Sequence, residues 1–310
     1  MEYGRSIKIK APATIANMVC GFDILGFAVA DPYDEMMITL RKEPGISIVH
    51  TDDHGLPTDP SNNVAGVALQ AMLAELTMPI GFDVTIHKHI KPGSGLGSSA
   101  ASAAGAVVAA NYLLGEVFSK ESLVQFAMHG EKLASGVKHA DNITPCIYGG
   151  ITLIRSIFPL DIIPLQPPPL FVTIVHPQIE VKTADARSIL KKQVYLKDAI
   201  KQWGNIAGLV SGLLQSDYNL IARSLEDVII EPVRSILIPG FDAIKERAKS
   251  VGALGGGISG SGPSVFMLSR SLETAQLVEI QMQQVFQQMN LLHYTYVTTV
   301  SPKGVQLFSE

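Results

Sequence analysis

The chain has 310 residues, a formal net charge of −4, and a composition that is 47% hydrophobic and 17% charged. This balance excludes an intrinsically disordered chain, and the length suits one large or two ordinary domains. The small negative charge gives no electrostatic reason to expect a nucleic acid or a membrane as a partner. The two cysteines, Cys20 and Cys146, are far apart and lack metal-ligand spacing, which favours a reducing, cytoplasmic location.

The first ninety residues mix strand and helix patterns. In chain order they predict a strand over 5–13 that Pro12 ends, strands over 34–42 and 45–51, a polar loop over 52–63, a helix over 64–76 and a strand over 81–90. Asn62 or Asn63 stands directly before the helix, where a side-chain oxygen caps the first N–H groups.

A glycine loop then runs directly into an uncharged helix, in the segment KPGSGLGSSAASAAGAVVAANYLLG over 91–115. The helix is close to the shortest length that spans a membrane. Its Ala, Ser and Gly residues are only weakly hydrophobic, however, and a helix that is apolar on all sides is usually buried inside a protein. We therefore expect a buried helix whose N-terminus holds the loop rigidly.

The remaining chain also alternates between the two kinds of element. It predicts a helix over 119–136, two strand pieces over 146–157, a strand over 171–176, helices over 184–192, 197–215, 217–230 and 240–250, a glycine cluster over 252–263, a strand over 264–268, a helix over 272–289 and a strand over 293–300. Four prolines near Gln166 mark a domain boundary, which divides the chain into 1–165 and 166–310. The mixture indicates an α+β or α/β class.

The first glycine loop has the form of an anion site. Gly95 and Gly97 let the backbone close on phosphate oxygens, and Ser98 and Ser99 supply hydroxyls at the positive end of the helix dipole. A simple turn before a tightly packed helix explains the composition equally well. No Gly-Lys-Ser/Thr ends the loop, so it is not a Walker A motif. The formal G-x-G-x-x-G over 255–260 follows a helix and precedes a strand, the reverse of the dinucleotide-binding context.

Three segments together resemble the three motifs of the GHMP kinases, the family of galactokinase, homoserine kinase, mevalonate kinase and phosphomevalonate kinase. They are PATIANMVCGFDILGFA at 12–28, GSGLGSSAASA at 93–103 and GGISGSGPSVFML at 256–268. Further segments, over 130–150, 176–187 and 226–241, resemble the homoserine kinase branch. The likeness spans essentially the whole chain.

The resemblance implies a two-domain α+β fold, with a ribosomal-S5-like domain over 1–165, a ferredoxin-like domain over 166–310 and the active site between them. It implies that ATP and L-homoserine give ADP and O-phospho-L-homoserine, a step toward threonine, and that the enzyme is a homodimer. A GHMP kinase for another small alcohol, such as mevalonate, and a catalytically silent ligand sensor remain alternatives. Mevalonate offers no cation to an ammonium site, and a sensor is expected to have lost the metal ligands.

By resemblance, ATP binds Asn62, Lys88, Lys91, Pro92, Gly93, Ser94, Gly95, Leu96, Gly97, Ser98, Ser99, Ala100 and Ala101. Lys91 stands where the family usually has proline, and we expect it to add a phosphate contact. Mg²⁺ is expected on Ser99 and Glu131. Without the resemblance, Glu131 reads as a solvated helix position, Lys88 as the outward side of a strand and Asn62 as a helix cap.

The resemblance also gives the residues around L-homoserine. Asp23 beside Asn17 accepts the ammonium group, and Arg187 and Arg234, with Thr183, bind the carboxylate, for which a planar guanidinium is well suited. The reacting hydroxyl is expected near His139, Asp141 and Asn142. Asp141 takes the hydroxyl proton as a base, or the γ-phosphate accepts it without a protein base; the sequence leaves both routes open.

Overall fold

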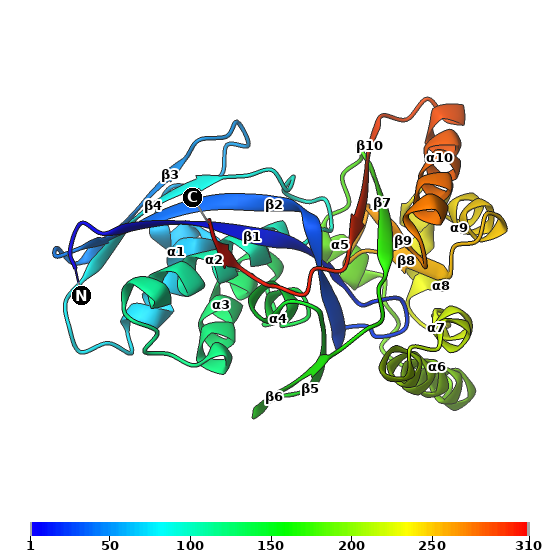
Figure 1. Cartoon of the computed structure of the whole chain (residues 1–310), viewed down its shortest axis with the longest axis horizontal. Helices are drawn as coiled ribbons and strands as arrows, with labels where there is room; N and C mark the ends of the chain where they lie inside the picture. The colour runs from blue at the N-terminus through cyan, green and yellow to red at the C-terminus, as the bar shows by residue number, and fades with distance from the viewer. Residues whose placement is uncertain (1, 309–310) are drawn as a thin grey trace.

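The structure, a computed structural model, describes residues 2–308, without the side chain of Ala184, and contains two sheets (Figure 1). The larger sheet has the order β11-β1-β2-β4-β3, and β5 and β6 extend it from β2. Its strands are β1 (Ser6–Ala16), β2 (Leu25–Arg41), β3 (Gly45–His50), β4 (Gly81–His87), β5 (Ile151–Ile157), β6 (Leu160–Leu165) and β11 (Gln306–Leu307). On one face lie the short η1 (Pro60–Asn62) and the helices α1 (Val64–Leu73), α2 (Ser98–Leu113), α3 (Lys120–Ser135) and α4 (Ile143–Tyr148) (Figure 1).

Helix α2 is the buried centre of this half. Thirteen of its sixteen residues are buried, because it packs on β1 and β2 and is covered by α1, α3 and α4. A Cβ at Gly105 would lie 3.2 Å from Ala11 and Ile9, so the small residues let the helix approach the sheet closely. This confirms the expected buried helix. No helix among residues 2–308 combines the length and apolar character that crossing a bilayer requires. The cytoplasmic location stays a prediction.

The smaller sheet has the order β10-β7-β9-β8, with β7 (Phe171–Pro177), β8 (Gly255–Ile258), β9 (Val265–Ser269) and β10 (His293–Thr299). The helices α9 (Phe241–Ser250) and α10 (Leu272–Gln288) complete a ferredoxin-like β-α-β-β-α-β unit. Between β7 and α9 the chain adds α5 (Thr183–Ser188), α6 (Leu196–Gln215), α7 (Tyr218–Ser224), α8 (Glu231–Arg234) and η2 (Ser235–Leu237). The expected two-unit α+β fold is confirmed.

The end of the chain returns to the first sheet. Val300 bridges Val29, and β11 pairs with β1 through Ile9 and Leu307, so both ends of the chain lie on the same side of the molecule (Figure 1). The proline-rich stretch does separate β6 from β7. A boundary between residues 165 and 166 stays a prediction, and the final strand crosses back over it.

Several local predictions were wrong. Pro12 does not end β1, because the register shifts between Pro12 and Thr14 and the strand continues to Ala16. The first predicted strand piece of 146–157 belongs to helix α4, which carries Pro145 in its first turn and ends at Gly149. The predicted helix over 217–230 ends at Ser224.

Helix α7 ends early because of Asp227, which follows it by three residues. Asp227 Oδ1 accepts hydrogen bonds from the N–H groups of Ile229 and Ile230, which gives the backbone an alternative to the helix. The glycine cluster over 252–263 contains strand β8 rather than only a loop.

Candidate active site

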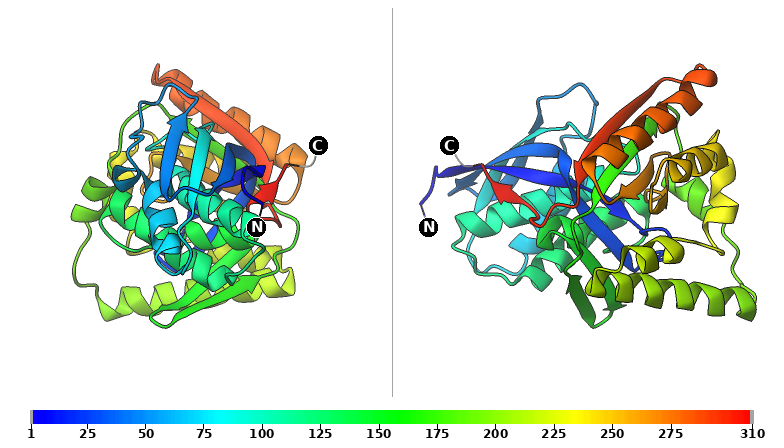
Figure 2. Two further views of the ribbon diagram at one scale, coloured as in Figure 1. Left: turned by 90° about the vertical axis from the view of Figure 1, so that its left-hand side faces the viewer. Right: turned by 45° about the vertical axis from the view of Figure 1, so that its right-hand side comes forward.

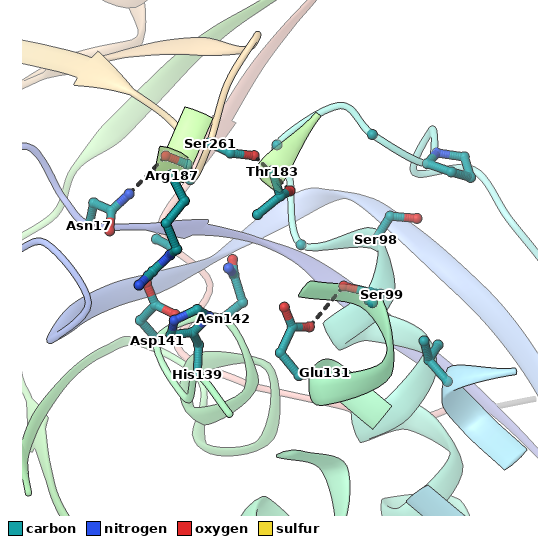
Figure 3. Close-up of a pocket in the computed structure, with 18 of the residues that line it drawn as sticks. Asn17, Ser98, Ser99, Glu131, His139, Asp141, Asn142, Thr183, Arg187 and Ser261 are labelled. Carbon is teal, nitrogen blue, oxygen red and sulfur yellow. Dashed lines mark hydrogen bonds between the residues drawn. The ribbon is translucent and has the colours of Figure 1, made fainter. Parts of the chain in front are cut away.

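A cavity of about 370 Å³ lies between the two halves, and most of the predicted site residues line it (Figure 3). Those that do are Asn17, Asp23, Lys88, Pro92, Gly93, Gly95, Gly97, Ser98, Ser99, Glu131, His139, Asp141, Asn142, Thr183, Arg187 and Arg234. Those outside its lining are Asn62, Lys91, Ser94, Leu96, Ala100 and Ala101. Gly260 and Ser261, which line it as well, were missed by the sequence reasoning.

The first glycine loop requires its glycines for two reasons. Gly93, Gly95 and Gly97 have φ angles of 76°, 80° and 68°, the left-handed region that favours glycine. A Cβ at Gly95 would lie 2.6 Å from the carbonyl oxygens of Ser259 and Gly262. The second glycine cluster therefore supports the first loop, and Ser259 Oγ donates to the Gly95 carbonyl at 2.7 Å.

The N-terminus of α2 is left open toward the cavity. Gly97 holds the cap position and supplies no side-chain hydrogen bond to the first N–H groups of the helix. Ser98 Oγ donates to the Ile90 carbonyl at 2.8 Å and anchors the first turn. Unpaired N–H groups at the positive end of a buried helix form an anion site. This arrangement can hold phosphate oxygens.

Lys88 was expected either to bind ATP or to lie on the outward side of a strand, and its ammonium group is instead buried in an ion pair. Its ammonium pairs with Asp34, which is fully buried with it, and donates to the Ser98 carbonyl at 2.7 Å and to Ser102 Oγ at 2.9 Å. Asp34 Oδ1 also accepts the N–H groups of His89 and Ile90, both at 2.8 Å. The pair thus ties β2, the entry to the loop and the first turn of α2 together.

Replacing Asp34 with alanine should destabilise the fold by about 3–5 kcal/mol, because the Lys88 ammonium would remain buried without its partner. Chemical unfolding of the two proteins measures the difference. The control is Arg155→Ala, which breaks the exposed pair of Arg155 with Asp161 and should cost no more than about 1 kcal/mol. Equal losses in the two variants would contradict the role given to the buried pair.

Two side chains that were predicted to contact the nucleotide form hydrogen bonds with other protein groups. Lys91 Nζ donates to Gln178 Oε1 at 2.5 Å and is exposed outside the cavity lining, so its phosphate contact stays a prediction. Asn62 is exposed and donates to Asp59 Oδ2 at 2.7 Å. Asn63, not Asn62, caps α1, with its Oδ1 accepting the Ala65 N–H. The remaining predicted loop and helix residues are buried and do not line the cavity; these are Ser94, Leu96, Ala100 and Ala101.

Ser99 and Glu131 form an oxygen pair at the start of α2. Ser99 Oγ donates to Glu131 Oε2 at 2.9 Å (Figure 3), and burial raises the pKa of the Glu131 carboxyl. A half-buried carboxylate beside a hydroxyl has the hard oxygen donors that Mg²⁺ prefers, and this ion keeps several waters or phosphate oxygens besides. No group of three His, Cys, Asp or Glu residues suited to a metal occurs within residues 2–308. The pair therefore fits a magnesium ion shared with phosphate.

The predicted ammonium and carboxylate sites lie against each other. Arg187 Nη2 donates to both oxygens of Asp23 at 2.8 Å. Arg234 is buried and held by the carbonyls of Ala186 and Gly260, at 3.0 and 3.2 Å. Both guanidinium groups lie by the Phe22 ring, at 5.5 and 4.9 Å from its centroid. The arrangement offers one anion and two cations to a small zwitterion.

The loop that carries Asp23 is conformationally strained. Asn17, Met18 and Val19 have φ angles of 73°, 38° and 65°, and Asp23 has 61°. Such angles are rare outside glycine, above all for a β-branched residue, and they cluster at functional sites. Asn17 stabilises the loop, since its Oδ1 accepts the Asp23 N–H at 3.1 Å and its Nδ2 donates to Gly260 at 2.8 Å.

Asp141 lines the cavity, as do His139 and Asn142 (Figure 3). Burial, together with the nearby charges of Asp23 and Glu131, raises the pKa of its carboxyl to about 7. Burial lowers the pKa of His139, whose Nε2 lies 3.9 Å from Asp23 Oδ2. Asn142 is fixed by Thr14, whose hydroxyl donates to its Oδ1 at 2.8 Å.

This fold and this cavity are those of a GHMP kinase, and the chain belongs to that family. The model of the GHMP kinases N terminal domain matches residues 62–150, and that of the GHMP kinases C terminal matches 209–288. Mevalonate kinase from L. major and galactokinase from Lactococcus lactis, at 17% and 13% identity, share the fold with TM-scores of 0.71 and 0.72.

Within the family the chain belongs with the homoserine kinases. It is 45% identical to the homoserine kinase of Chloroherpeton thalassium over 96% of this chain and 98% of the relative. The homoserine kinase of Chlorobium phaeovibrioides is 48% identical over 91% and 92%. The crystal structure of homoserine kinase from Cytophaga hutchinsonii is 48% identical, covers 99% of both chains and superimposes with a TM-score of 0.95.

Proposed function

We propose that this chain transfers the γ-phosphoryl group of ATP to the side-chain hydroxyl of L-homoserine. One observation carries the proposal: the Asp23, Arg187 and Arg234 group shares a cavity with the open N-terminus of α2. A zwitterion and a polyphosphate are the ligands that such a pair of sites accepts. The names of the relatives agree with this pairing.

On the phosphate side, the backbone N–H groups of Gly95, Gly97, Ser98 and Ser99, which line the cavity, hold the phosphate oxygens, and the helix dipole favours their charge. Ser99 and Glu131 would hold Mg²⁺, which supplies neutralisation of the charge on the bridging phosphates. The Lys88–Asp34 pair keeps the first turn of α2 in place and so positions the donors. The residues thereby orient ATP.

On the acceptor side, L-homoserine enters between Asp23 and Arg187. Its ammonium group replaces Arg187 as the partner of Asp23, and its carboxylate takes Arg187, Arg234 and the Thr183 hydroxyl. Asp23 and Arg187 thereby exchange their mutual ion pair for the two charged groups of the substrate, so neither is left without an opposite charge. The zwitterion is thereby aligned with its hydroxyl toward Asp141 and Asn142.

The transfer forms a bond from the homoserine oxygen to the γ-phosphorus and breaks the bond to ADP. Asp141 accepts the hydroxyl proton, because a pKa near 7 places its carboxylate where a general base works well. Asn142 and His139 line the same part of the cavity and orient the hydroxyl.

A panel assay of ADP release tests the proposal. L-Homoserine should give a kcat/KM at least about 100-fold above that of mevalonate or galactose, because these alcohols leave Asp23 without a cation. Faster turnover of mevalonate would favour the other-alcohol alternative. Ligand binding without turnover of any alcohol would favour a silent sensor.

Replacing Glu131 with glutamine should lower kcat by about 10- to 100-fold, since charge compensation at the phosphates is lost. The unfolding temperature should be kept or raised, because burial disfavours the charged carboxylate. Glu121→Gln, an exposed change on the same helix, is the matched control. Near-normal turnover of Glu131→Gln at saturating Mg²⁺ would contradict the assignment.

A further inference from the structure

Helix α6 runs along the edge of the molecule and has one polar side chain among its buried residues (Figure 1 and the right-hand view of Figure 2). That residue is Gln202, which is 6% exposed, and the other buried residues of the helix are Ala199, Leu209, Gly212 and Leu213. A buried amide destabilises a fold unless its donors and its acceptor are paired. The partners of Gln202 lie in two segments that shape the active-site cavity.

All hydrogen-bonding groups of the Gln202 amide are used. Its Nε2 donates to the Cys20 carbonyl at 2.9 Å and to Asp227 Oδ1 at 3.0 Å. Its Oε1 accepts the Val228 N–H at 3.1 Å. A reversed amide would set an acceptor against the Cys20 carbonyl and a carboxylate, so these partners allow one orientation. The side chain therefore joins two segments, one from each half of the chain.

The first of these segments is the loop that carries Asp23. Val19 and Asp23, on either side of Cys20, have φ angles of 65° and 61°. A backbone in this region persists only where the surrounding structure holds it. Asn17 holds the loop from within, since its Oδ1 accepts the Asp23 N–H. Gln202 adds a restraint from another element, through the Cys20 carbonyl.

The second segment leads into α8, which carries Arg234. Asp227 accepts the N–H groups of Ile230 and Glu231, each at 3.0 Å. These groups stand at the start of α8, where Ile230 provides no side-chain cap. The Arg234 N–H in turn donates to the Ile230 carbonyl at 3.0 Å. Asp227 therefore fixes the start of the helix that presents the buried guanidinium, and Gln202 holds Asp227.

Packing alone does not fix the distance between the two segments. A hollow of about 20 Å³ lies between them, with Val19 and Phe22 on one side and Asp227 and Arg234 on the other. This hollow means that the segments are incompletely packed against each other. The Gln202 amide joins them at Asp227, which lines the hollow.

We propose, on the basis of the function proposed above, that Gln202 is a positioning residue for L-homoserine. Gln202 lies outside the lining of the active-site cavity, so it acts through the residues that it holds. It sets the distance between Asp23 and Arg234, the anion and the buried cation that the zwitterion spans. A ligand with both charges depends on this distance. A ligand with one charge can shift in the cavity to follow the single group that binds it.

Steady-state kinetics of Gln202→Met with three alcohols test the proposal. Methionine keeps the length of the side chain and removes the amide. The kcat/KM for L-homoserine should fall by about 10- to 100-fold, because a misplacement of about 1 Å costs that much. The analogues are 3-amino-1-propanol, which lacks the carboxylate, and 4-hydroxybutyrate, which lacks the ammonium group. Their kcat/KM, and the KM for ATP, should each change by less than about threefold, since none of them spans the two groups.

Thr173→Val is the matched control for a loss of stability. Thr173 is fully buried outside the cavity lining, and its hydroxyl donates to the Ala275 carbonyl at 2.8 Å. Removing this buried hydrogen bond should lower the unfolding temperature, as Gln202→Met does. It should leave the kcat/KM of all three alcohols unchanged.

Gln202→Asn gives the same test if Gln202→Met does not fold, because its shorter amide cannot reach both segments. A loss with either analogue as large as the loss with L-homoserine would overturn the proposal, and so would a kcat/KM for L-homoserine within about threefold of the wild type. These results would leave the turnover of L-homoserine by the wild type intact. A wild type that does not phosphorylate L-homoserine would instead contradict the proposed function.

Discussion

Replacing Arg234 with leucine is expected to raise the KM for L-homoserine by about 30- to 4,000-fold and to leave the KM for ATP within about twofold, because truncating one partner of a buried charge pair costs several kcal/mol. Arg234 is buried, and the carbonyls of Ala186 and Gly260 hold it in one orientation. A carboxylate that reaches it therefore meets a guanidinium already in place.

Arg187→Leu should also lose homoserine affinity, and for an additional reason. The change removes the guanidinium that pairs with Asp23, so the substrate ammonium alone has to compensate the charge of Asp23. Arg→Lys at either position should be impaired, since a point charge does not reproduce the planar fork. Arg155→Leu on the surface is the control.

A substrate analogue separates the carboxylate site from the ammonium site. 3-Amino-1-propanol keeps the amine and the hydroxyl and lacks the carboxylate. It should be a far poorer substrate than L-homoserine for the wild type, and both leucine variants should discriminate against it less. A variant that lost ATP binding while its homoserine KM stayed normal would move that arginine to the nucleotide side.

Asp141→Asn should lower kcat by about 10²- to 10⁴-fold if Asp141 is the base. The kcat/KM of the wild type should rise with pH through about 7, as the carboxyl loses its proton, and the variant's residual activity should lack this rise. A loss below about tenfold would show that the γ-phosphate accepts the proton without a protein base.

The same variant should be more stable than the wild type at neutral and alkaline pH. The pKa of Asp141 is raised in the folded state from 3.8 to about 7, so the folded chain holds this proton more tightly than the unfolded chain. Stability from this group is therefore complete at low pH and is lost as pH rises to about 7. Asparagine stays neutral, so the gap in unfolding temperature should open between about pH 4 and 7 and stay constant above. A variant less stable than the wild type at about pH 8 would contradict the buried, desolvated carboxyl.

The glycine loop and its helix could be predicted from the sequence, because the residues that determine them lie within one continuous segment. Alternate glycines followed by an uncharged Ala-rich helix predicted a loop that opens a buried helix, and the structure shows that helix with left-handed angles at the glycines. The loop itself indicated Ser99 as a phosphate-site hydroxyl, but its metal role came only with the family resemblance. Glu131, Asp23 and the two arginines also came only with the resemblance. The structure brings them into one cavity from both halves of the chain.

Contacts between segments that are distant in the sequence could not be predicted from sequence patterns. Asp34 lies 54 residues before Lys88, and nothing in either strand marks the two as a pair. Ser259 lies 164 residues after the Gly95 that it supports. Helix α4 was missed because six residues are too few for a clear periodicity. In each case the tertiary partner decides the conformation, and the partner is distant in the sequence.

The phosphorus NMR spectrum of the product shows whether the chain phosphorylates the side-chain hydroxyl of L-homoserine. With ATP, Mg²⁺ and L-homoserine, we expect a phosphomonoester resonance coupled to the protons of the side-chain methylene that bore the hydroxyl, formed in equal amount with ADP. Release of inorganic phosphate alone, or a phosphoryl group on any other atom of homoserine, would show that this is not the reaction.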